Sequence, residues 1–482
     1  MKDSQYHLNA NLRFDLFQQM VLWLSSTMYA PRKGRRYLER NLTLLEIEVD
    51  RELEKLIAAH MHDTFEVKQQ MQTYQALLRD IHQRGGTLNA IREAYVNAYG
   101  GFALDLPQWL EKVEEKQALL RRLNRPERTT RAQVALLREA FMRALQDGSV
   151  ARECIAEIQN VLGNTLVQNS HSYSYAAHLQ ALEQGMACHE SALSVYTFER
   201  YPLQHAKTRM FLGLAYQQYG KTGQDSDLWD AIEQAIRSYE EALRIYTFDD
   251  FPEQWALLQT HLGSAYLERN QGDPQENQEY ALACHKAALQ IAEQLVLASV
   301  LTTIQINLAD TYRLRMAGSR ADNLKLAMHY YRVVLRTITP HTHPSLWAAI
   351  HIKLATLFEE EVASLIEDNA QHDLKLRCAI VCCEGALGVY TLDAYPVEYA
   401  ATLVMLGRLH SERRGGDLLH NIEQAIKCYR DALRVFSSQA FPTEYRQVLR
   451  CFAQAEEQRK LHEESTGGHK GNAPTIYGPV RI

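Results

Sequence analysis

The stretch ALSVYT at residues 192–197 recurs in this sequence as ALRIYT at 242–247, ALGVYT at 386–391 and ALRVFS at 432–437. Two degenerate copies lie between these, ALQI at 288–291 and VLRT at 334–337. Equivalent positions are separated by 50, 46, 46, 52 and 46 residues. A period in this range is typical of repeat proteins, in which each repeat is one supersecondary unit that packs on its neighbours.

Each copy carries the same marks downstream. Ten to twelve residues beyond a proline, a Leu-Gly or Leu-Ala step precedes an aromatic residue, as in Leu212-Gly213 before Tyr216. A proline fits the first turn of a helix, where its missing N–H costs nothing. The small residues recur where two helices must approach closely. The proline itself lies six residues after the Tyr or Phe in most copies, at Pro202, Pro252, Pro344, Pro396 and Pro442, while the third copy has Ala298 there.

The recurring stretch also lies on an amphipathic helix. Between residues 235 and 246 the apolar side chains follow a 3.6-residue period, which places them on one helix face. We therefore predict that each repeat is a pair of helices. One such pair cannot bury its apolar face alone and must stack on the next pair. The face is formed by Ala235, Ile236, Tyr239, Ala242, Leu243 and Tyr246.

These residues resemble the tetratricopeptide repeat (TPR) family. Its pattern places Leu-Gly and then Tyr in the first helix, and two alanines seven residues apart in the second. Here such alanine pairs occur at 235/242, 281/288, 379/386 and 425/432, with Ala327/Val334 as a degraded copy. The resemblance covers roughly residues 178–460 and implies an α-solenoid. Long-period arrays of this kind resemble those of large bacterial signalling and defence proteins, some coupled to CHAT caspase-like peptidases.

The repeat length departs from the family's usual 34 residues. We expect the excess in the turn before each proline and in the loop between the paired helices. Such loops could carry binding specificity or serve as spacers, and the sequence leaves both open. The predicted loops are 220–228, 270–277, 361–372 and 415–420.

The rest of the chain lacks the repeat marks. Residues 1–177 predict an N-terminal helical domain, either a distinct bundle, which we favour, or diverged helix pairs that cap the solenoid. Its helices are predicted at 11–29, 36–60, 65–83, 87–98, 107–124, 130–146 and 150–167, with a break at Pro31–Gly34 among others. The array would occupy 178–461, and 462–482 would form a flexible tail.

The cysteine spacing indicates a protein of a reducing compartment, while the small net charge points to no class of partner. The net charge is −6, of which residues 1–150 contribute +3 and the remainder −9. The eight cysteines show no spacing of a secreted disulfide framework, and Phe17–Ala30 is too polar and too short for a signal peptide or a membrane span. We therefore predict a cytoplasmic protein without a membrane segment.

The sequence offers no catalytic constellation. Its Gly-Gly pairs lack the strand and the Lys-Ser/Thr of a phosphate-binding loop. Cys188, Cys284, Cys382 and Cys428 share one repeat position and are expected to be packing residues. Cys378, Cys382 and Cys383 lie close in sequence, but a metal site would need further ligands. We predict no enzyme activity, no cofactor and no metal.

A basic cluster raises one alternative function. Arg32, Lys33, Arg35 and Arg36 place four positive charges in five residues. A TPR-containing regulator could bind nucleic acid through such a cluster in its mildly basic N-terminal domain. The sequence shows no recognition-helix pattern, so we favour a solvated or protein-contacting surface.

The favoured function is a scaffold or adaptor that binds a protein or peptide. In a TPR superhelix the first helices line the concave surface, so the resemblance points to polar residues on those helices. The N-terminal domain would supply a second partner site or self-association. The candidate peptide-binding residues are Arg209, Gln259, Asn307, Lys353 and Arg408.

Overall fold

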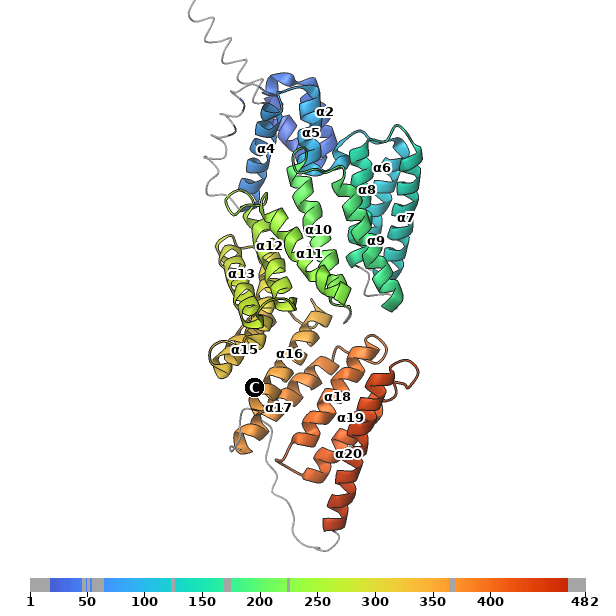
Figure 1. Ribbon diagram of the computed structural model, residues 1–482, viewed down its shortest axis with the longest axis vertical. Helices are drawn as coiled ribbons and strands as arrows, with labels where there is room; N and C mark the ends of the chain where they lie inside the picture. Colours follow the sequence, from blue (N-terminus) through green and yellow to red (C-terminus); the bar gives the residue numbers. More distant parts are fainter. Residues whose placement is uncertain are drawn as a thin grey trace, which may run out of the picture. The chain divides into compact units, whose positions relative to one another are not determined.

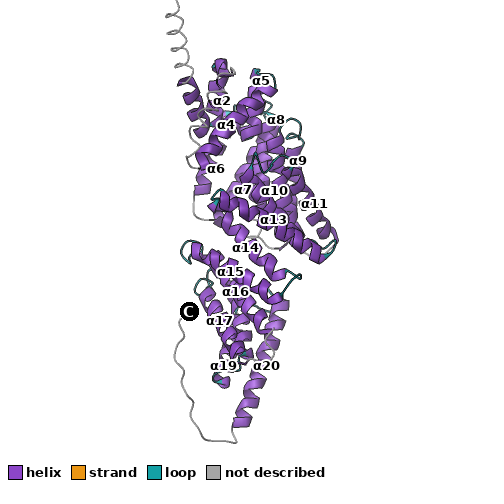
Figure 2. Cartoon of the chain, turned by 90° about the vertical axis from the view of Figure 1, so that its left-hand side faces the viewer, coloured by secondary structure: helices purple, strands orange, loops and turns teal. Residues whose placement is uncertain are grey.

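The computed structural model describes residues 18–45, 49, 53, 65–122, 126–168, 175–222, 226–363 and 369–466. Within these ranges the regular secondary structure is entirely helical (Figure 2). Residues 18–29 are helical. The other elements are α2 (Pro31–Arg40), η1 (Leu42–Leu45), α4 (Phe65–Gln83), α5 (Leu88–Tyr99), η2 (Gly101–Ala103), α6 (Gln108–Arg122), α7 (Pro126–Gln146), α8 (Arg152–Gln168), α9 (Tyr175–Leu193), α10 (Pro202–Gly220), α11 (Ser226–Leu243), α12 (Pro252–Glu268), α13 (Pro274–Gln294), α14 (Ala298–Leu314), α15 (Arg320–Thr337), α16 (Pro344–Ala363), α17 (Asn369–Leu387), α18 (Pro396–Glu412), α19 (Leu418–Ala432) and α20 (Pro442–Thr466).

The chain divides into two compact units, Met1–Leu301 and Thr302–Ile482. This boundary falls inside α14, within the predicted array, and the first unit contains both the N-terminal helices and the first repeats (Figure 1). The predicted limits at 177 and 461 stay predictions. The last helix, α20, runs on to Thr466, and the remainder of the predicted tail lies outside the described residues.

Within each unit, most consecutive helices pack as pairs, and neighbouring pairs pack on one another. Within a pair, α8 packs on α9, α10 on α11, α12 on α13, α16 on α17 and α18 on α19. Between pairs, α9 packs on α10, α11 on α12, α15 on α16, α17 on α18 and α19 on α20. This order of contacts confirms the predicted all-α solenoid of stacked helix pairs.

In several pairs, an aromatic or histidine ring of the second helix packs against a glycine of the first helix. A Cβ added to Gly213 would lie 2.6 Å from the Tyr239 ring, and one added to Gly407 would lie 2.7 Å from the Tyr429 ring. Gly163 of α8 meets the ring of His189 on α9 in the same way. Because Gly163 and Gly213 are 50 residues apart, α8 and α9 have the packing of a repeat, although α8 lies in the region predicted as the N-terminal domain.

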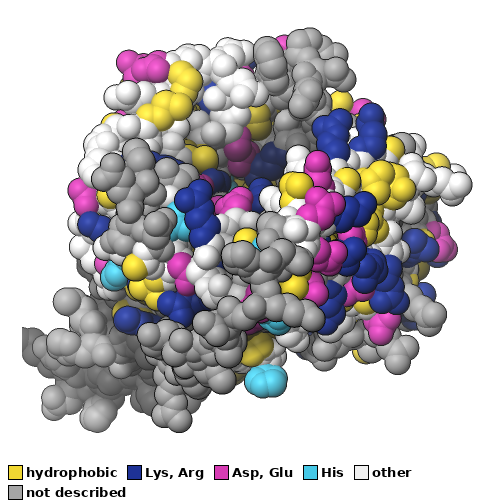
Figure 3. All heavy atoms as spheres, turned by 90° about the horizontal axis from the view of Figure 1, so that it is seen from below, with side chains coloured by type: hydrophobic (Ala, Val, Ile, Leu, Met, Phe, Trp, Pro, Cys, Tyr) yellow, Lys and Arg dark blue, Asp and Glu magenta, His cyan; other side chains and the backbone are white. Residues whose placement is uncertain are grey.

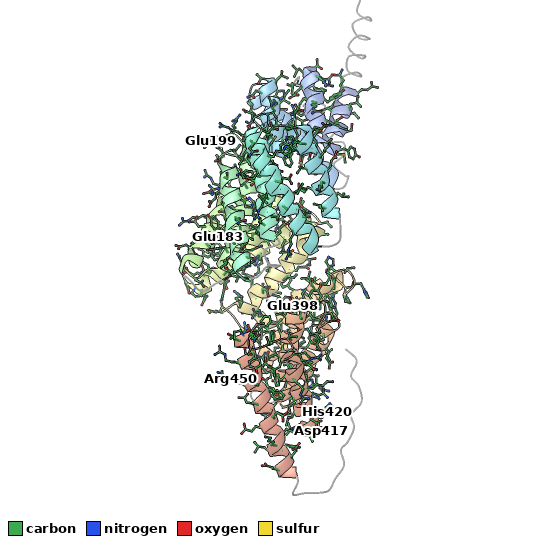
Figure 4. The ribbon with its side chains drawn as sticks, turned by 90° about the vertical axis from the view of Figure 1, so that its right-hand side faces the viewer. Glu183, Glu199, Glu398, Asp417, His420 and Arg450 are labelled. Carbon is green, nitrogen blue, oxygen red and sulfur yellow. The ribbon has the colours of Figure 1, made fainter. Side chains whose placement is uncertain are left out.

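The loops inside the pairs are shorter than predicted. α10 and α11, for example, are separated by five residues, and α12 and α13 by five. The predicted loop limits are therefore too wide, because the polar residues at the end of each predicted loop begin the next helix. Asp273 accepts the backbone N–H of Gln275, and Asp417 accepts those of Leu419 and His420 (Figure 4), as N-cap residues do.

The turns before Pro202 and Pro252 are longer than the loops inside the pairs. Eight residues separate α9 from α10, and eight separate α11 from α12. Two aromatic rings pack edge to face across each of these two turns, with centroids 5.8 Å apart for Tyr196 and Tyr201 and 5.4 Å apart for Tyr246 and Phe251. This geometry adds to the free energy of burying the rings. The repeated aromatic before the proline is therefore a packing residue.

The N-terminal helices form their own core around Trp23. Its indole N–H donates to the hydroxyl of Tyr95 on α5 (2.7 Å). The predicted break at Pro31–Gly34 is wrong, because Pro31 occupies the first turn of α2 and starts this helix. Gly34 lies inside α2, where a Cβ would clash with Thr27 at 2.0 Å, so the glycine permits close helix packing rather than a turn.

The N-terminal helices join the repeats through a glycine turn after α5. Gly100 has a φ of 83°, and its neighbour Gly101 lies directly on the start of α8. The Tyr196 hydroxyl accepts the Gly101 N–H (3.0 Å) and lies 3.0 Å from the Glu157 carboxylate. Val96, Leu104, Cys154, Ala192 and Tyr196 share one buried core, so α5, α8 and α9 are packed as one body.

Candidate interaction surface

Ion pairs join successive first helices in the second unit. Lys353 on α16 places its ammonium 2.6 and 2.7 Å from the two carboxylate oxygens of Asp310 on α14. Arg408 on α18 lies 2.8 Å from Glu359 on α16. These contacts place α14, α16 and α18 side by side. We call the face formed by the first helices of a unit its first-helix surface.

Asp310 also connects to the second helix of its own pair. The buried Tyr331 hydroxyl, on α15, donates to the same carboxylate. Burial and the neighbouring Asp310 charge raise the pKa of Tyr331 well above its usual value, so the hydroxyl keeps its proton. Lys353 and Tyr331 thus hold one carboxylate from two sides, which restricts its rotamers.

The first unit repeats this arrangement with different side chains. The Tyr239 hydroxyl on α11 donates to the side-chain Oε1 of Gln217 on α10 (2.8 Å), and the side-chain Nε2 of Gln217 donates to Glu268 on α12 (3.0 Å). Lys221 lies 2.8 Å from the other oxygen of Glu268. In both units, therefore, a ring from a second helix, a polar group from a first helix and a charge from the next first helix form one network.

The structure assigns different positions to the five predicted peptide-binding residues. Lys353 and Arg408 lie on the first-helix surface, with 38% and 50% of their side chains exposed. Arg209 instead pairs with Glu241 on the second helix α11 (2.7 Å). Gln259 is half-buried at the repeat position of Arg209, and Asn307 is half-buried on α14.

The partner carboxylates Asp310, Glu359 and Glu241 were missed by the sequence reasoning. A signal was present, because Asp310 and Glu359 lie 43 and 49 residues before Lys353 and Arg408, close to one repeat length. Opposite charges one repeat apart on first helices predict a contact between neighbouring helices. The described contacts do not connect any two of the five predicted residues directly.

The basic cluster at residues 32–36, proposed from the sequence to bind nucleic acid, forms ion pairs inside the fold. Arg32 contacts Glu111 (3.0 Å) and Glu114 (2.8 Å) on α6. Arg35 is 1% exposed, donates to the Ala103 carbonyl and pairs with Glu39 and Asp105. Arg36 also pairs with Asp105, and Lys33 is exposed. Three of the four charges hold α2 against α6 and the η2 turn, so the cluster does not support a nucleic-acid site.

The repeat-position cysteines are packing residues in the structure. Burial raises the pKa of Cys188, Cys284 and Cys428 to about 11 and that of Cys382 to about 12. At neutral pH these thiols are protonated, which makes them poor nucleophiles and poor metal ligands. The described residues bring together no group of three or more His, Cys, Asp or Glu side chains that could hold a metal ion.

The exposed charges of both signs are mixed. On the face shown in Figure 3, basic and acidic side chains of the described residues lie intermingled. Each helix in the described ranges is too short or too polar to cross a lipid bilayer.

Comparison with known proteins adds little to this geometry. No family model matches the sequence, and no curated protein matches it. One solved structure with some similarity is a circular tandem repeat protein with novel repeat topology and enhanced subunit contact surfaces. It is 14% identical over 93% of this chain and 99% of that chain, with a TM-score of 0.25. The description of the fold therefore stands on the helix pairs themselves.

Proposed function

We propose that this protein is a non-enzymatic scaffold that binds a protein or peptide segment on its first-helix surface. One observation carries the proposal: ion pairs connect successive first helices and hold charged side chains at a spacing set by the repeat. A peptide that crosses several first helices would meet groups that are already ordered, and preorganisation lowers the entropic cost of binding.

The Lys353–Asp310 and Arg408–Glu359 pairs are the proposed contact groups. Each is partly exposed, so a charged ligand could compete for one partner of the pair. Ion pairs of this kind contribute little to stability, about 0–1 kcal/mol. Breaking one so that a partner can bind a ligand therefore costs little free energy. From the family resemblance alone, we further propose that the scaffold works in the cytoplasm as part of a bacterial signalling or defence system.

The test is selection of peptides from a random displayed library against the full chain, followed by fluorescence anisotropy. Lys353→Ala and Arg408→Ala should weaken the selected peptides at least about five-fold, since each removes a contact worth about 1 kcal/mol. Lys427→Ala and Arg430→Ala are matched controls, because both residues are exposed on the second helix α19. The controls should bind within about two-fold of the parent protein.

Two results would contradict the proposal. The library could yield no peptide that binds the full chain. Alternatively, selected peptides could bind the Lys353→Ala and Arg408→Ala variants as tightly as the parent protein, while circular dichroism shows both variants to be folded. Either result would remove the first-helix surface as the binding site.

A further inference from the structure

A second candidate site lies in the first unit, in a cavity of about 400 Å³. Helices α7, α8 and α9 form it, with α8 packed against both of the others. This volume is within the usual range for ligand pockets. The cavity is lined by Arg131, Val134, Ala135, Arg138, Leu166, Ala177, Gln180, Ala181 and Gln184.

The floor of the cavity is apolar. Val134, Leu166 and Ala181 are 7%, 3% and 5% exposed and belong to one buried cluster. Ala135 is an exposed residue of α7 that also lines the cavity. An aliphatic side chain of a ligand could therefore be buried against this floor. Such burial favours binding in proportion to the apolar area removed from water.

The rim carries two arginines that have no acidic partner among the described side chains. Arg131 and Arg138 are both exposed on α7. Among the residues that the structure describes, neither guanidinium pairs with a carboxylate, and Arg138 donates only to the neutral Gln184 side chain. This differs from Arg32 and Arg35, whose charges are neutralised inside the fold.

The spacing of the arginines sets the spacing of the groups that they can bind. They are seven residues apart on one helix, which is two turns or about 10 Å. In an extended peptide the side chains alternate between two faces, so those that face one surface lie two or four residues apart. Four residues, at about 3.3 Å each, span about 13 Å, a distance that two arginine side chains about 10 Å apart on the helix can reach. Gln180 and Gln184 lie on the facing helix α9 one turn apart, and their amides can both donate to and accept from a peptide backbone.

We propose that this cavity binds an extended peptide segment in which an apolar side chain lies midway between two carboxylates four residues apart. The apolar side chain occupies the floor, and the carboxylates pair with Arg131 and Arg138. This site is separate from the first-helix surface, so its failure would leave the proposed scaffold function untouched.

The test uses a fluorescent heptapeptide with two glutamates four positions apart and a leucine midway between them. The full chain should bind it, and binding should weaken in 0.5 M salt because the rim charges are exposed. Arg131→Gln and Arg138→Gln should each weaken binding about five-fold, and the double variant more. Ala135→Trp should block the cavity, since this exposed position can accept a large side chain without disturbing the core.

Matched controls separate this site from general charge attraction. Arg237→Gln removes an exposed arginine on α11 and should leave binding unchanged. A peptide with glutamines in place of both glutamates, and one with serine in place of the leucine, should each bind at least about five-fold more weakly. The proposal is overturned if the parent peptide does not bind at millimolar concentration. It is equally overturned if the folded double arginine variant or Ala135→Trp binds like the parent protein.

Discussion

Replacing Gly101 by alanine should destabilise the first unit strongly. A Cβ at this position would lie 1.9 Å from the Glu153 carbonyl oxygen and 2.6 Å from the Cys154 backbone nitrogen. Atoms in van der Waals contact are at least about 3.5 Å apart. The backbone of helix α8 cannot move aside as the end of a flexible side chain can. Overpacking of this kind costs about 1–3 kcal/mol. Separation of the turn from α8 would also break the Gly101 N–H bond to Tyr196, which adds about 1 kcal/mol.

The expected total is therefore a loss of about 2–4 kcal/mol in the free energy of unfolding. Urea unfolding followed by far-ultraviolet circular dichroism and tryptophan fluorescence would measure it. Gly148→Ala is the matched control, because a Cβ there meets no atom within 4 Å, and it should change stability by less than about 0.5 kcal/mol. If Gly101→Ala were as stable as Gly148→Ala, the close docking of the glycine turn on α8 would be refuted.

Three further predictions concern charges and thiols. His189 is fully buried, and burial lowers its pKa to about 4. His189 is therefore protonated at a lower pH in the native state than in the unfolded chain. Stability should thus fall as the pH drops from about 6.5 to 4, by about 1.4 kcal/mol per unit at most, and urea titrations should show a flatter pH dependence for His189→Gln. Lys353→Glu should cost about 1 kcal/mol and Lys353→Glu with Asp310→Lys should recover most of it; an additive double-variant cycle would disprove the pairing. The repeat-position cysteines should react with iodoacetamide at pH 8 far more slowly in the native protein than in urea, because burial raises their pKa to about 11 or 12; equal rates, measured by mass spectrometry, would contradict this.

The helices themselves followed well from local sequence signals. The predicted helix at 65–83 has the observed limits, and that at 107–124 differs from α6 by one or two residues at each end. Errors arose where one residue type has two structural uses. Pro31 was interpreted as a break although it starts α2, and the polar residues near Asp273 and Asp417 were interpreted as loop although they cap helices.

The candidate surface was predicted only in part. Lys353 and Arg408 do lie on first helices and face their neighbours, whereas Arg209 contacts a second helix. The repeat pattern identifies which helix a residue belongs to, but the side of the helix depends on how the pair is rotated against its neighbours. The cavity between α7 and α9 could not be predicted, since its arginines are ordinary surface residues in sequence.

The sequence by itself determined the all-helical class, the pairing of the helices and their stacking order, because a periodic apolar face can be buried only against an equivalent face of the next repeat. Only the tertiary structure decided which charged side chains form ion pairs inside the fold and which remain exposed and accessible to a ligand. Arg35 and Arg131 are indistinguishable as residues, yet Arg35 is buried between carboxylates and Arg131 lines the rim of a cavity, without a carboxylate partner among the described residues. The physical reason is that ion pairing depends on distances of a few ångströms between segments far apart in the chain, and local periodicity carries no information about them.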